Sequence, residues 1–410
     1  MNYRPRLIAD KISHALDSFP VVVLAGARQT GKSMLLRNDS RLKKRPYFTC
    51  DDPQTMLSIT AAGEEFLQSQ PLLNLDEAQR APQLFLTLKR IVDNERQRGR
   101  FLITGSAQFL LLRNLGDSLA GRAGYIRLFP ACLYELRQIT EEPALFRFCE
   151  SNGDISHFQK KNMLQWDNQW LVRGGYPEPA WVDSIDIRLW CEAYEATYIE
   201  RDIRELAGNL DPLAFQRFLR IAASWNGSLL NQANIARDAG LNNVTCGRYI
   251  HLLEVSGLLT RIYPYFDNAG KRYVKSPKIL FTDTTLAAYL AGMQQALDDE
   301  KHPYYGRFFE SFVMQNLLAL TDAYIHGVMK LYHLRTTSGF EIDAIIELNG
   351  NLTAIEIKSS HTVNKTSADK VIKFIESQPN CTAGIVAYRG DRILPLGKNV
   401  WAVPVGVLLT

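Results

Sequence analysis

The chain has 410 residues, of which 46% are hydrophobic and 22% charged, and its formal net charge is +4. These values are ordinary for globular domains with their own cores, and the length allows two to four domains. The small net charge does not by itself indicate a nucleic-acid-binding protein, so any basic surface must be local. The six cysteines are widely spaced and form no Cys-x-x-Cys pair, which argues against a disulfide framework or a zinc site.

The apolar runs of the sequence are short. Val21–Ala25 and the run from Phe109 to Leu112 are far below the length of a membrane span, and the first residues, Met-Asn-Tyr-Arg-Pro-Arg, lack an apolar signal core. We therefore expect a cytoplasmic protein with reduced thiols and no membrane partner.

The first 132 residues alternate between short apolar strands and helical stretches. A helix is expected over Ile8–Leu16, and strands are expected at Val21–Leu24, Tyr47–Cys50, Leu72–Leu75 and Phe101–Thr104. Such alternation predicts an α/β fold with a parallel sheet that is covered on both faces.

A glycine-rich loop follows the first of these strands and precedes a helical run. In such a loop, backbone N–H groups and the helix N-terminus face phosphate oxygens, the lysine contacts the β- and γ-phosphates, and the serine hydroxyl binds Mg²⁺. The chain lacks the Asn-Lys-x-Asp motif that specifies guanine, so the expected cofactors are ATP and Mg²⁺. The expected nucleotide-binding residues of the loop are Gly26, Ala27, Arg28, Gln29, Thr30, Gly31, Lys32 and Ser33.

Two acidic residues, Asp76 and Glu77, come directly after the strand Leu72–Leu75. A carboxylate at the end of a buried strand can hold Mg²⁺, which assigns Asp76 to the metal together with Ser33. Glu77 can then act as general base on the attacking water. With the glycine-rich loop, this pair predicts ATP hydrolysis, with Lys32 and Glu77 as catalytic residues.

Two further residues of this region have two interpretations each. Ser106, in Thr104-Gly-Ser106, ends the next strand, where its hydroxyl would either face the γ-phosphate or cap a helix. Arg122 precedes the last core strand and is either an arginine finger or a surface charge. Both are candidate ATP-site residues.

These motifs resemble a prokaryotic AAA-type P-loop ATPase family in which a P-loop domain precedes a C-terminal region of unknown function. The resemblance rests on the glycine-rich loop, Asp76-Glu77-Ala-Gln, Thr104-Gly-Ser106 and Ser118-Leu-Ala-Gly-Arg122. It continues over nearly the whole chain, through Gly174-Gly-Tyr-Pro177, Glu200-Arg-Asp202-Ile and Ser276-Pro-Lys278-Ile-Leu-Phe-Thr-Asp283. The later motifs identify the family without indicating its task.

Residues 133–224 have helical periodicity and are predicted to form a linker or lid, whereas residues 225–295 have the pattern of a winged-helix domain: helix, glycine turn, helix and two strands. Its second helix would lie in a DNA major groove while the basic wing holds phosphates. The alternative is a module for packing or protein contact. The expected internal residues are Ile235, Val244, Ile250 and Leu253, and the basic ones are Arg237, Arg248, Arg261, Lys271, Arg272, Lys275 and Lys278.

Residues 296–410 are predicted to form an α/β domain with a carboxylate cluster. Asp343 lies on one expected strand, and Glu356 and Lys358 lie on the next, where residues two apart point to the same face. Two carboxylates can hold a Mg²⁺ ion that activates water for phosphodiester attack, and Lys358 can stabilise developing charge. Glu310, on the preceding helix, is a further candidate ligand.

This pattern, Asp followed by Glu-x-Lys on the next strand, resembles the restriction-endonuclease-like superfamily. The resemblance implies that Asp343, Glu356 and Lys358 are catalytic and that Glu310, Asp343 and Glu356 bind the metal. The alternative is an exposed charged hairpin, and the fold by itself does not establish cleavage.

The leading hypothesis is an ATP-hydrolysing, DNA-associated protein that couples its nucleotide state to the winged-helix and nuclease-like modules. DNA and further copies of the chain are the candidate partners. The second hypothesis is a signalling or interaction switch whose nuclease-like domain is a scaffold that cleaves nothing. Stimulation of ATP turnover by DNA would separate them.

Overall fold

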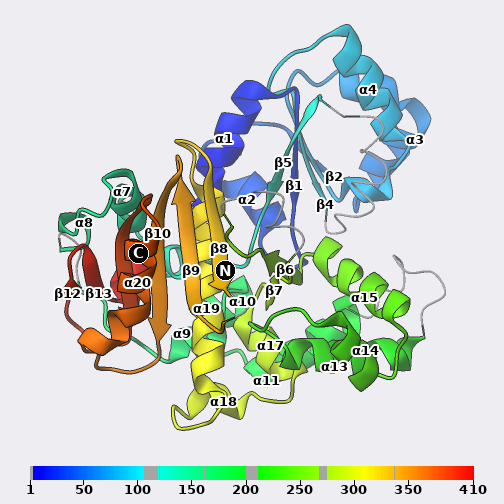
Figure 1. Ribbon diagram of the computed structural model, residues 1–410. Coiled ribbons are helices and arrows are strands. Elements are labelled where there is room, and N and C mark those ends of the chain that lie inside the picture. Colours follow the sequence, from blue (N-terminus) through cyan, green and yellow to red (C-terminus); the bar gives the residue numbers. More distant parts are fainter. Residues whose placement is uncertain are drawn as a thin grey trace. The chain divides into compact units, whose positions relative to one another are not determined.

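The computed structural model describes residues 3–105, 119, 121–159, 163–199, 211–266, 275–336 and 338–410. Its contacts divide the chain into two compact units, each with a large β-sheet (Figure 1). The first unit contains residues 1–130, 192–210 and 251–258, and the second contains residues 131–191, 211–250 and 259–410. The predicted division into four domains is finer and stays a prediction. No described helix is long and apolar enough to cross a membrane.

The first unit contains a five-stranded sheet in the order β2-β3-β4-β1-β5, and every neighbouring pair in it is parallel. This confirms the predicted parallel sheet of a P-loop domain. The strands are β1 (Val21–Ala25), β2 (Tyr47–Thr49), β3 (Leu73–Asp76), β4 (Phe101–Gly105) and β5 (Ala123–Arg127). The helices of its N-terminal part are α1 (Ile8–Ser18), α2 (Lys32–Asn38), α3 (Pro53–Gln68), η1 (Ala78–Arg80) and α4 (Leu84–Asn94).

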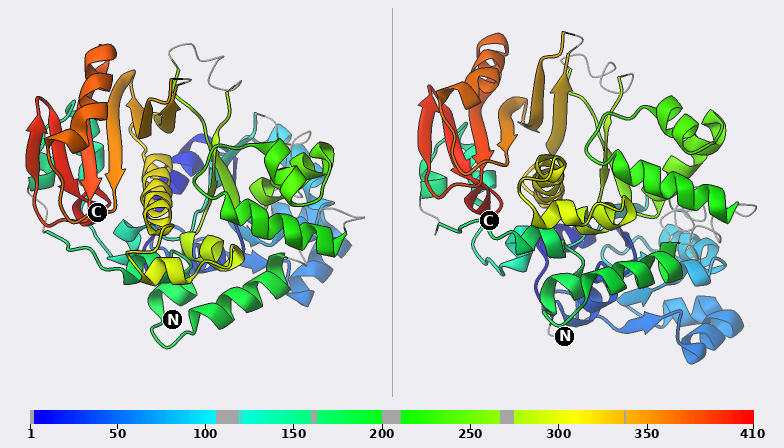
Figure 2. Two further views of the ribbon diagram at one scale, coloured as in Figure 1. Left: turned by 60° about the horizontal axis from the view of Figure 1, so that its bottom comes forward. Right: turned by 90° about the horizontal axis from the view of Figure 1, so that it is seen from below.

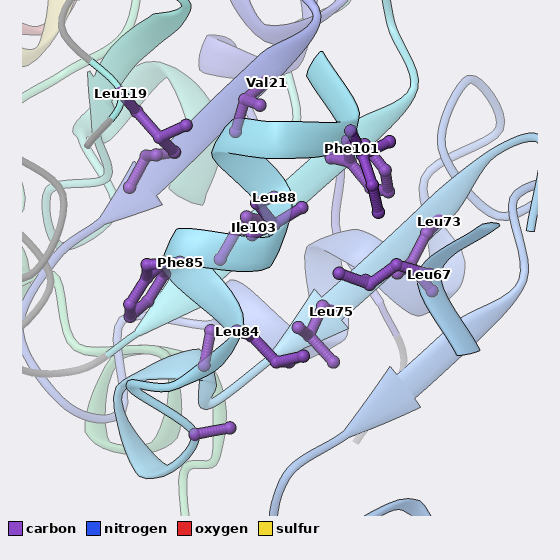
Figure 3. Close-up of a cluster of buried hydrophobic side chains, with 14 of the residues drawn as sticks. Val21, Leu67, Leu73, Leu75, Leu84, Phe85, Leu88, Phe101, Ile103 and Leu119 are labelled. Carbon is purple, nitrogen blue, oxygen red and sulfur yellow. The ribbon is translucent and has the colours of Figure 1, made fainter. Parts of the chain in front are cut away.

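The core of this unit lies between the sheet and helices α3 and α4 (Figure 3). Alternate side chains of β1, β3 and β4 face Leu84, Phe85 and Leu88 of α4, whereas α1 packs against β1 and β5. Burial of each Leu or Phe side chain contributes about 1.5–3 kcal/mol. The carboxyl ends of the strands, where the candidate site residues lie, are therefore held by a well-packed sheet.

The second unit contains a six-stranded mixed sheet in the order β12-β13-β11-β10-β9-β8. Its strands are β8 (Met329–Arg335), β9 (Glu341–Leu348), β10 (Asn351–Lys358), β11 (Cys381–Tyr388), β12 (Leu394–Gly397) and β13 (Val400–Pro404). Helix α19 (Tyr305–Ala323) packs beside β8, β9 and β10, and α20 (Asp369–Ser377) connects the parallel strands β10 and β11 (Figure 2). The sequence did not predict β8 or β12.

The rest of the second unit is mainly helical, which the sequence predicted for its residues from 133 to 224. Its elements are α6 (Leu133–Leu136), α7 (Ala144–Glu150), α8 (Ser156–Gln159), α9 (Gln169–Arg173), α10 (Pro177–Trp181), α17 (Thr284–Leu290), α18 (Gln295–Asp298), η3 (Lys365–Ala368) and α21 (Val405–Leu408). Helix α11 (Ile187–Tyr194) and the π-helix η2 (Glu195–Ile199) continue into the first unit. Two family motifs meet here, because the N–H of Gly175 donates to the Asp283 carboxylate at 2.7 Å.

The predicted helix–turn–helix is present as α14 (Gln232–Asp238) and α15 (Asn243–Val255), preceded by α13 (Pro212–Ser224) and followed by the antiparallel strands β6 (Leu259–Ile262) and β7 (Lys278–Phe281). The Tyr249 ring packs on Phe215 and Phe218 with centroid distances of 5.2 and 5.4 Å. Val244, expected to be internal, is 84% exposed, because the first turn of α15 extends beyond this packing. Residues 267–274, which include Lys271 and Arg272, lie outside the described residues, and the winged-helix assignment stays a prediction.

Candidate functional site

The glycine-rich loop lies between the carboxyl end of β1 and the first residue of α2, Lys32. A Cβ atom on Gly26 would lie 2.4 Å from the Leu128 carbonyl oxygen, so the loop starts with a close backbone contact that only glycine allows. Gln29 and Gly31 have φ angles of 60° and 95°. These left-handed residues curl the backbone around the start of the helix, where N–H groups can face an anion.

The Lys32 side chain is held inside this loop. It is 5% exposed, and its ammonium group donates to the carbonyl oxygens of Gly26 at 2.9 Å and Ala27 at 2.8 Å. The Thr30 hydroxyl also donates to the Ala27 carbonyl at 2.9 Å. The positive charge is therefore fixed in the loop before any phosphate arrives.

Residues outside the loop also hold its shape. The buried Arg6 guanidinium donates to the carbonyl oxygens of Thr30 and Phe129, both at 2.7 Å. The Tyr194 hydroxyl donates to the Arg28 carbonyl at 3.2 Å. Sequence analysis missed both residues, since neither belongs to a recognisable motif.

Gly257, two residues after the end of α15, is a third residue outside the loop that holds its shape. A Cβ atom there would lie 2.8 Å from the backbone nitrogen of Ala27, and its φ of +78° is already strained for any other residue. We expect Gly257→Ala to shift the loop and raise the Kd for ATP about tenfold or more, since each 1.4 kcal/mol of misfit costs a factor of ten. Calorimetric titration with a non-hydrolysable ATP analogue measures this.

The matched control is Gly292→Ala. Gly292 has a similar φ of +67° but no atom within 4 Å of its added Cβ, so it carries the backbone cost without the contact. Equal ATP affinity in the two variants would show that the contact of Gly257 with the loop does not matter for binding.

Asp76 is the centre of a hydrogen-bond network at the carboxyl end of β3. Its carboxylate accepts from the Tyr47 hydroxyl at 2.6 Å and from the Thr104 hydroxyl, and the Ser33 hydroxyl is hydrogen-bonded to Tyr47. Burial and the hydrogen bond to Asp76 raise the pKa of Tyr47 well above its usual value, so Tyr47 stays a donor. The predicted Mg²⁺ ligands Ser33 and Asp76 are thus joined through Tyr47, which sequence analysis missed.

Glu77 begins the turn after β3 in an unusual backbone conformation. Its φ and ψ are 53° and 38°, in the left-handed region that glutamate rarely adopts. The Gln79 amide donates to its carboxylate, and the residue is half-buried. Strained residues of this kind are frequent at functional sites, because the surrounding structure must hold them there.

The two remaining ATP-site candidates have different outcomes. Ser106 lies outside the described residues. Arg122 precedes β5, whose first residue pairs with Val21, the first residue of β1, and its guanidinium is paired with Asp93. The glycine-rich loop follows the opposite end of β1, roughly 13 Å away along the strand. Arg122 therefore does not reach the loop of its own chain, and a finger role would serve a second copy.

The residues of this site fit Mg²⁺ and a nucleoside triphosphate. A hydroxyl and a carboxylate, from Ser33 and Asp76, are the hard oxygen ligands that Mg²⁺ prefers, and Lys32 supplies the charge for phosphates. A side chain at Gly26 would collide with the Leu128 carbonyl and displace the start of the loop.

The C-terminal candidates meet at β9 and β10. The Asp343 carboxylate accepts from the N–H of Ile357 at 2.8 Å, and the Lys358 ammonium donates to Oε1 of Glu356 at 2.7 Å. Lys370 of α20, which the sequence did not single out, donates to the same oxygen at 3.2 Å. Glu356 is 1% exposed, and its buried Oε2 has no hydrogen-bond partner among the described residues.

Glu310 and Lys278 form the other side of this cluster. The Lys278 ammonium lies 2.8 Å from Glu310 and 3.2 Å from Glu341. Lys278 is buried, so the expectation that it contacts DNA phosphates was wrong. Burial by itself lowers the pKa of Lys278, but the carboxylates, with Glu310 first, outweigh it and raise the pKa. Burial, and then Glu310 and Glu356, raise the pKa of Asp343.

The predicted metal ligands Glu310, Asp343 and Glu356 are near one another, but Glu310 is paired with Lys278. Within the described part of the chain, no group of three or more His, Cys, Asp or Glu side chains is arranged to hold a metal ion. A cation at this site would therefore rest on two carboxylates and water, which Mg²⁺ accepts.

Comparison with protein families divides the chain into three matched regions. An AAA domain matches residues 18–137, which confirms the AAA-type P-loop domain and supports nucleotide binding and ATPase activity. A domain of unknown function (DUF8612) matches residues 165–297, and another (DUF4143) matches residues 305–408.

Two uncharacterized proteins, Rv2008c of Mycobacterium tuberculosis and Mb2031c of Mycobacterium bovis, are similar over almost the full chain. Each is 30% identical over 404 residues, which cover 98% of this chain and 84% of the relative.

Among solved structures, a Walker-type ATPase of Pyrococcus abyssi aligns with a TM-score of 0.44 and 18% identity, over 70% of this chain and 99% of that chain. A Thermotoga maritima RuvB variant aligns with a TM-score of 0.29 and 19% identity, over 65% and 94% of the two chains.

Proposed function

The chain belongs to the same family as these two mycobacterial proteins and carries an AAA domain, and from this we propose that it binds and hydrolyses ATP and couples its nucleotide state to DNA contact. The observation that carries the ATPase proposal is the Asp76 network. It joins Ser33 of the glycine-rich loop, Tyr47 of β2 and Thr104 of β4 around one buried carboxylate.

Each residue has a distinct proposed role. Lys32 binds the β- and γ-phosphates, and Ser33 and Asp76 hold Mg²⁺, which supplies charge stabilisation at the transferring phosphoryl group. Tyr47 and Thr104 orient the Asp76 carboxylate. Glu77 accepts a proton from the attacking water, and its strained backbone and its bond to Gln79 fix its position. Arg122 and Ser106 remain candidates, Arg122 as a finger for a neighbouring copy in a homo-oligomer.

The DNA proposal rests on the helix–turn–helix. The first turn of α15 is exposed and carries Asn243 and Val244, and Arg248 follows one turn later, also exposed. An exposed helix start after a glycine turn has the form that enters a major groove. The test is phosphate release from Mg-ATP with and without DNA, because a protein-binding switch would not respond to DNA.

Reversal of Arg248, Lys271 and Arg272 to glutamate is expected to weaken DNA binding and reduce its salt dependence. Each lost phosphate contact lowers the log–log salt slope by about one unit, so the slope should fall by up to about three units. Fluorescence anisotropy at several salt concentrations measures this. The control reverses Lys43, Lys44 and Lys398, which are exposed and give the same charge change. Equal slopes in both variants would remove the helix–turn–helix as the DNA site.

One observation favours the second candidate function, a switch whose C-terminal sheet cleaves nothing. The carboxylates there are already neutralised in part by Lys278, Lys358 and Lys370. ATP turnover that does not change when DNA is added, together with DNA that stays intact in the same assay, would support this second candidate function.

A further inference from the structure

Lys278 lies in a buried part of the second unit and belongs to a family motif without a known task. The backbone around it is hydrogen-bonded on both sides. Strand β7 pairs with β6, while the Leu230 N–H donates to the Pro277 carbonyl at 2.7 Å and the Ile279 N–H donates to the Ser228 carbonyl at 2.9 Å. The Lys278 side chain therefore starts from a fixed backbone position.

That ammonium group lies where a cation would be expected in a carboxylate cluster. It is within 3.2 Å of both Glu310 and Glu341, and its side chain is 6% exposed. A buried ammonium that contacts two carboxylates is costly to remove, because the two acids would then repel each other without compensation.

The other side of the cluster is different. Glu356 accepts from Lys358 and Lys370 through Oε1, and both lysines are well exposed along their side chains, at 37% and 48%. Oε2 of the same carboxylate is buried and has no hydrogen-bond partner among the described residues. A buried unpaired carboxylate oxygen carries a desolvation cost that a bound cation would remove. Asp343, buried next to it, supplies a second carboxylate.

We infer that the Lys278 ammonium group occupies the cation position beside Glu310. The C-terminal site then binds a single divalent ion through Asp343 and Glu356. This inference rests on the C-terminal metal site described with the candidate functional site and changes its ligand set. Glu310 pairs with lysine and not with metal. Lys278 links β7, the second strand after the helix–turn–helix, to the metal site, which gives the Ser276–Asp283 motif a role.

The test counts Mn²⁺ ions bound by the nucleotide-free full chain, from the loss of the free-ion electron paramagnetic resonance signal. The ion that Asp343→Asn removes is the one assigned to this cluster. We expect one such ion in the wild-type protein and the same ion in Glu310→Gln. Lys278→Met, which removes the charge and keeps the length, should gain a second ion or bind the first about tenfold more tightly. Lys278→Arg should behave as the wild type.

Results other than these would contradict either the metal ligands or the role of Lys278. Loss of the ion in Glu310→Gln would make Glu310 a ligand, and wild-type binding by Lys278→Met would mean that Lys278 excludes nothing. An ion gained by Lys278→Met but absent from the wild type would leave the role of Lys278 intact and reject the native metal site. No Asp343-dependent ion in either protein would reject both. If Lys278→Met loses its near-ultraviolet circular dichroism signal, Glu310→Gln and Lys278→Arg decide.

Discussion

Glu77→Gln is expected to keep ATP binding and to lower kcat by about 10²- to 10⁴-fold, the contribution of a general base. Glutamine has the same shape and can keep the contact with Gln79, but it cannot accept the proton of the attacking water. The change acts on the transition state and not on bound ATP, so kcat should fall while the Kd for ATP stays constant.

Phosphate release in single-turnover and steady-state assays measures kcat, and titration with an ATP analogue measures the Kd. Glu376→Gln, on the exposed side of α20, is the matched control for the loss of one carboxylate. Phosphate release at the wild-type rate by Glu77→Gln would exclude Glu77 as the general base. Asp76 would then be the remaining acidic candidate of this site.

The sequence predicts candidate ATP-site residues where the signal depends on local order along the chain. A glycine-rich loop between a strand and a helix, and acidic residues at a strand end, keep their meaning without knowledge of the tertiary fold. Tyr47 could not be found this way. Its contact with Asp76 arises because β2 pairs with β3 in the sheet, and no spacing along the chain records that pairing.

Arg122 is a residue whose place in the sheet also cannot be predicted from the order of residues along the chain. Its motif lies next to a core strand, which is a suitable place for a catalytic arginine. The direction of the strand places Arg122 away from the glycine-rich loop of its own chain, because parallel strands have all their amino ends at the edge opposite the loop. Chain order alone does not tell which edge a residue occupies.

In the C-terminal sheet, the period of two along β10 correctly predicts that Glu356 and Lys358 converge. Lys278 was misjudged because a lysine in a basic stretch is normally exposed. Only the tertiary fold shows that β7 carries it to Glu310 and Glu341. Val244 is the opposite case, an apolar residue whose helical spacing indicates a core position but which lies in an exposed first turn.

Lys32→Ala is expected to abolish the stabilisation of the protein by ATP. A ligand at 100 times its Kd stabilises the folded state by about 2.7 kcal/mol, and this gain disappears when the phosphates lose their charged contact. Thermal unfolding with and without a non-hydrolysable ATP analogue and Mg²⁺ gives the shift in Tm, which should be several degrees in the wild type and close to zero in the variant.

The comparison must use the shift and not the Tm itself. The Lys32 ammonium also donates to the carbonyl oxygens of Gly26 and Ala27, so its removal takes a hydrogen bond from each of them and lowers the Tm of the nucleotide-free protein. Lys43→Ala, at an exposed position after α2, controls for the loss of one positive charge. If Lys32→Ala unfolds at a lower temperature but keeps the wild-type shift, Lys32 supports the loop without binding phosphate. A lost shift in a variant that remains folded places its ammonium group on the nucleotide.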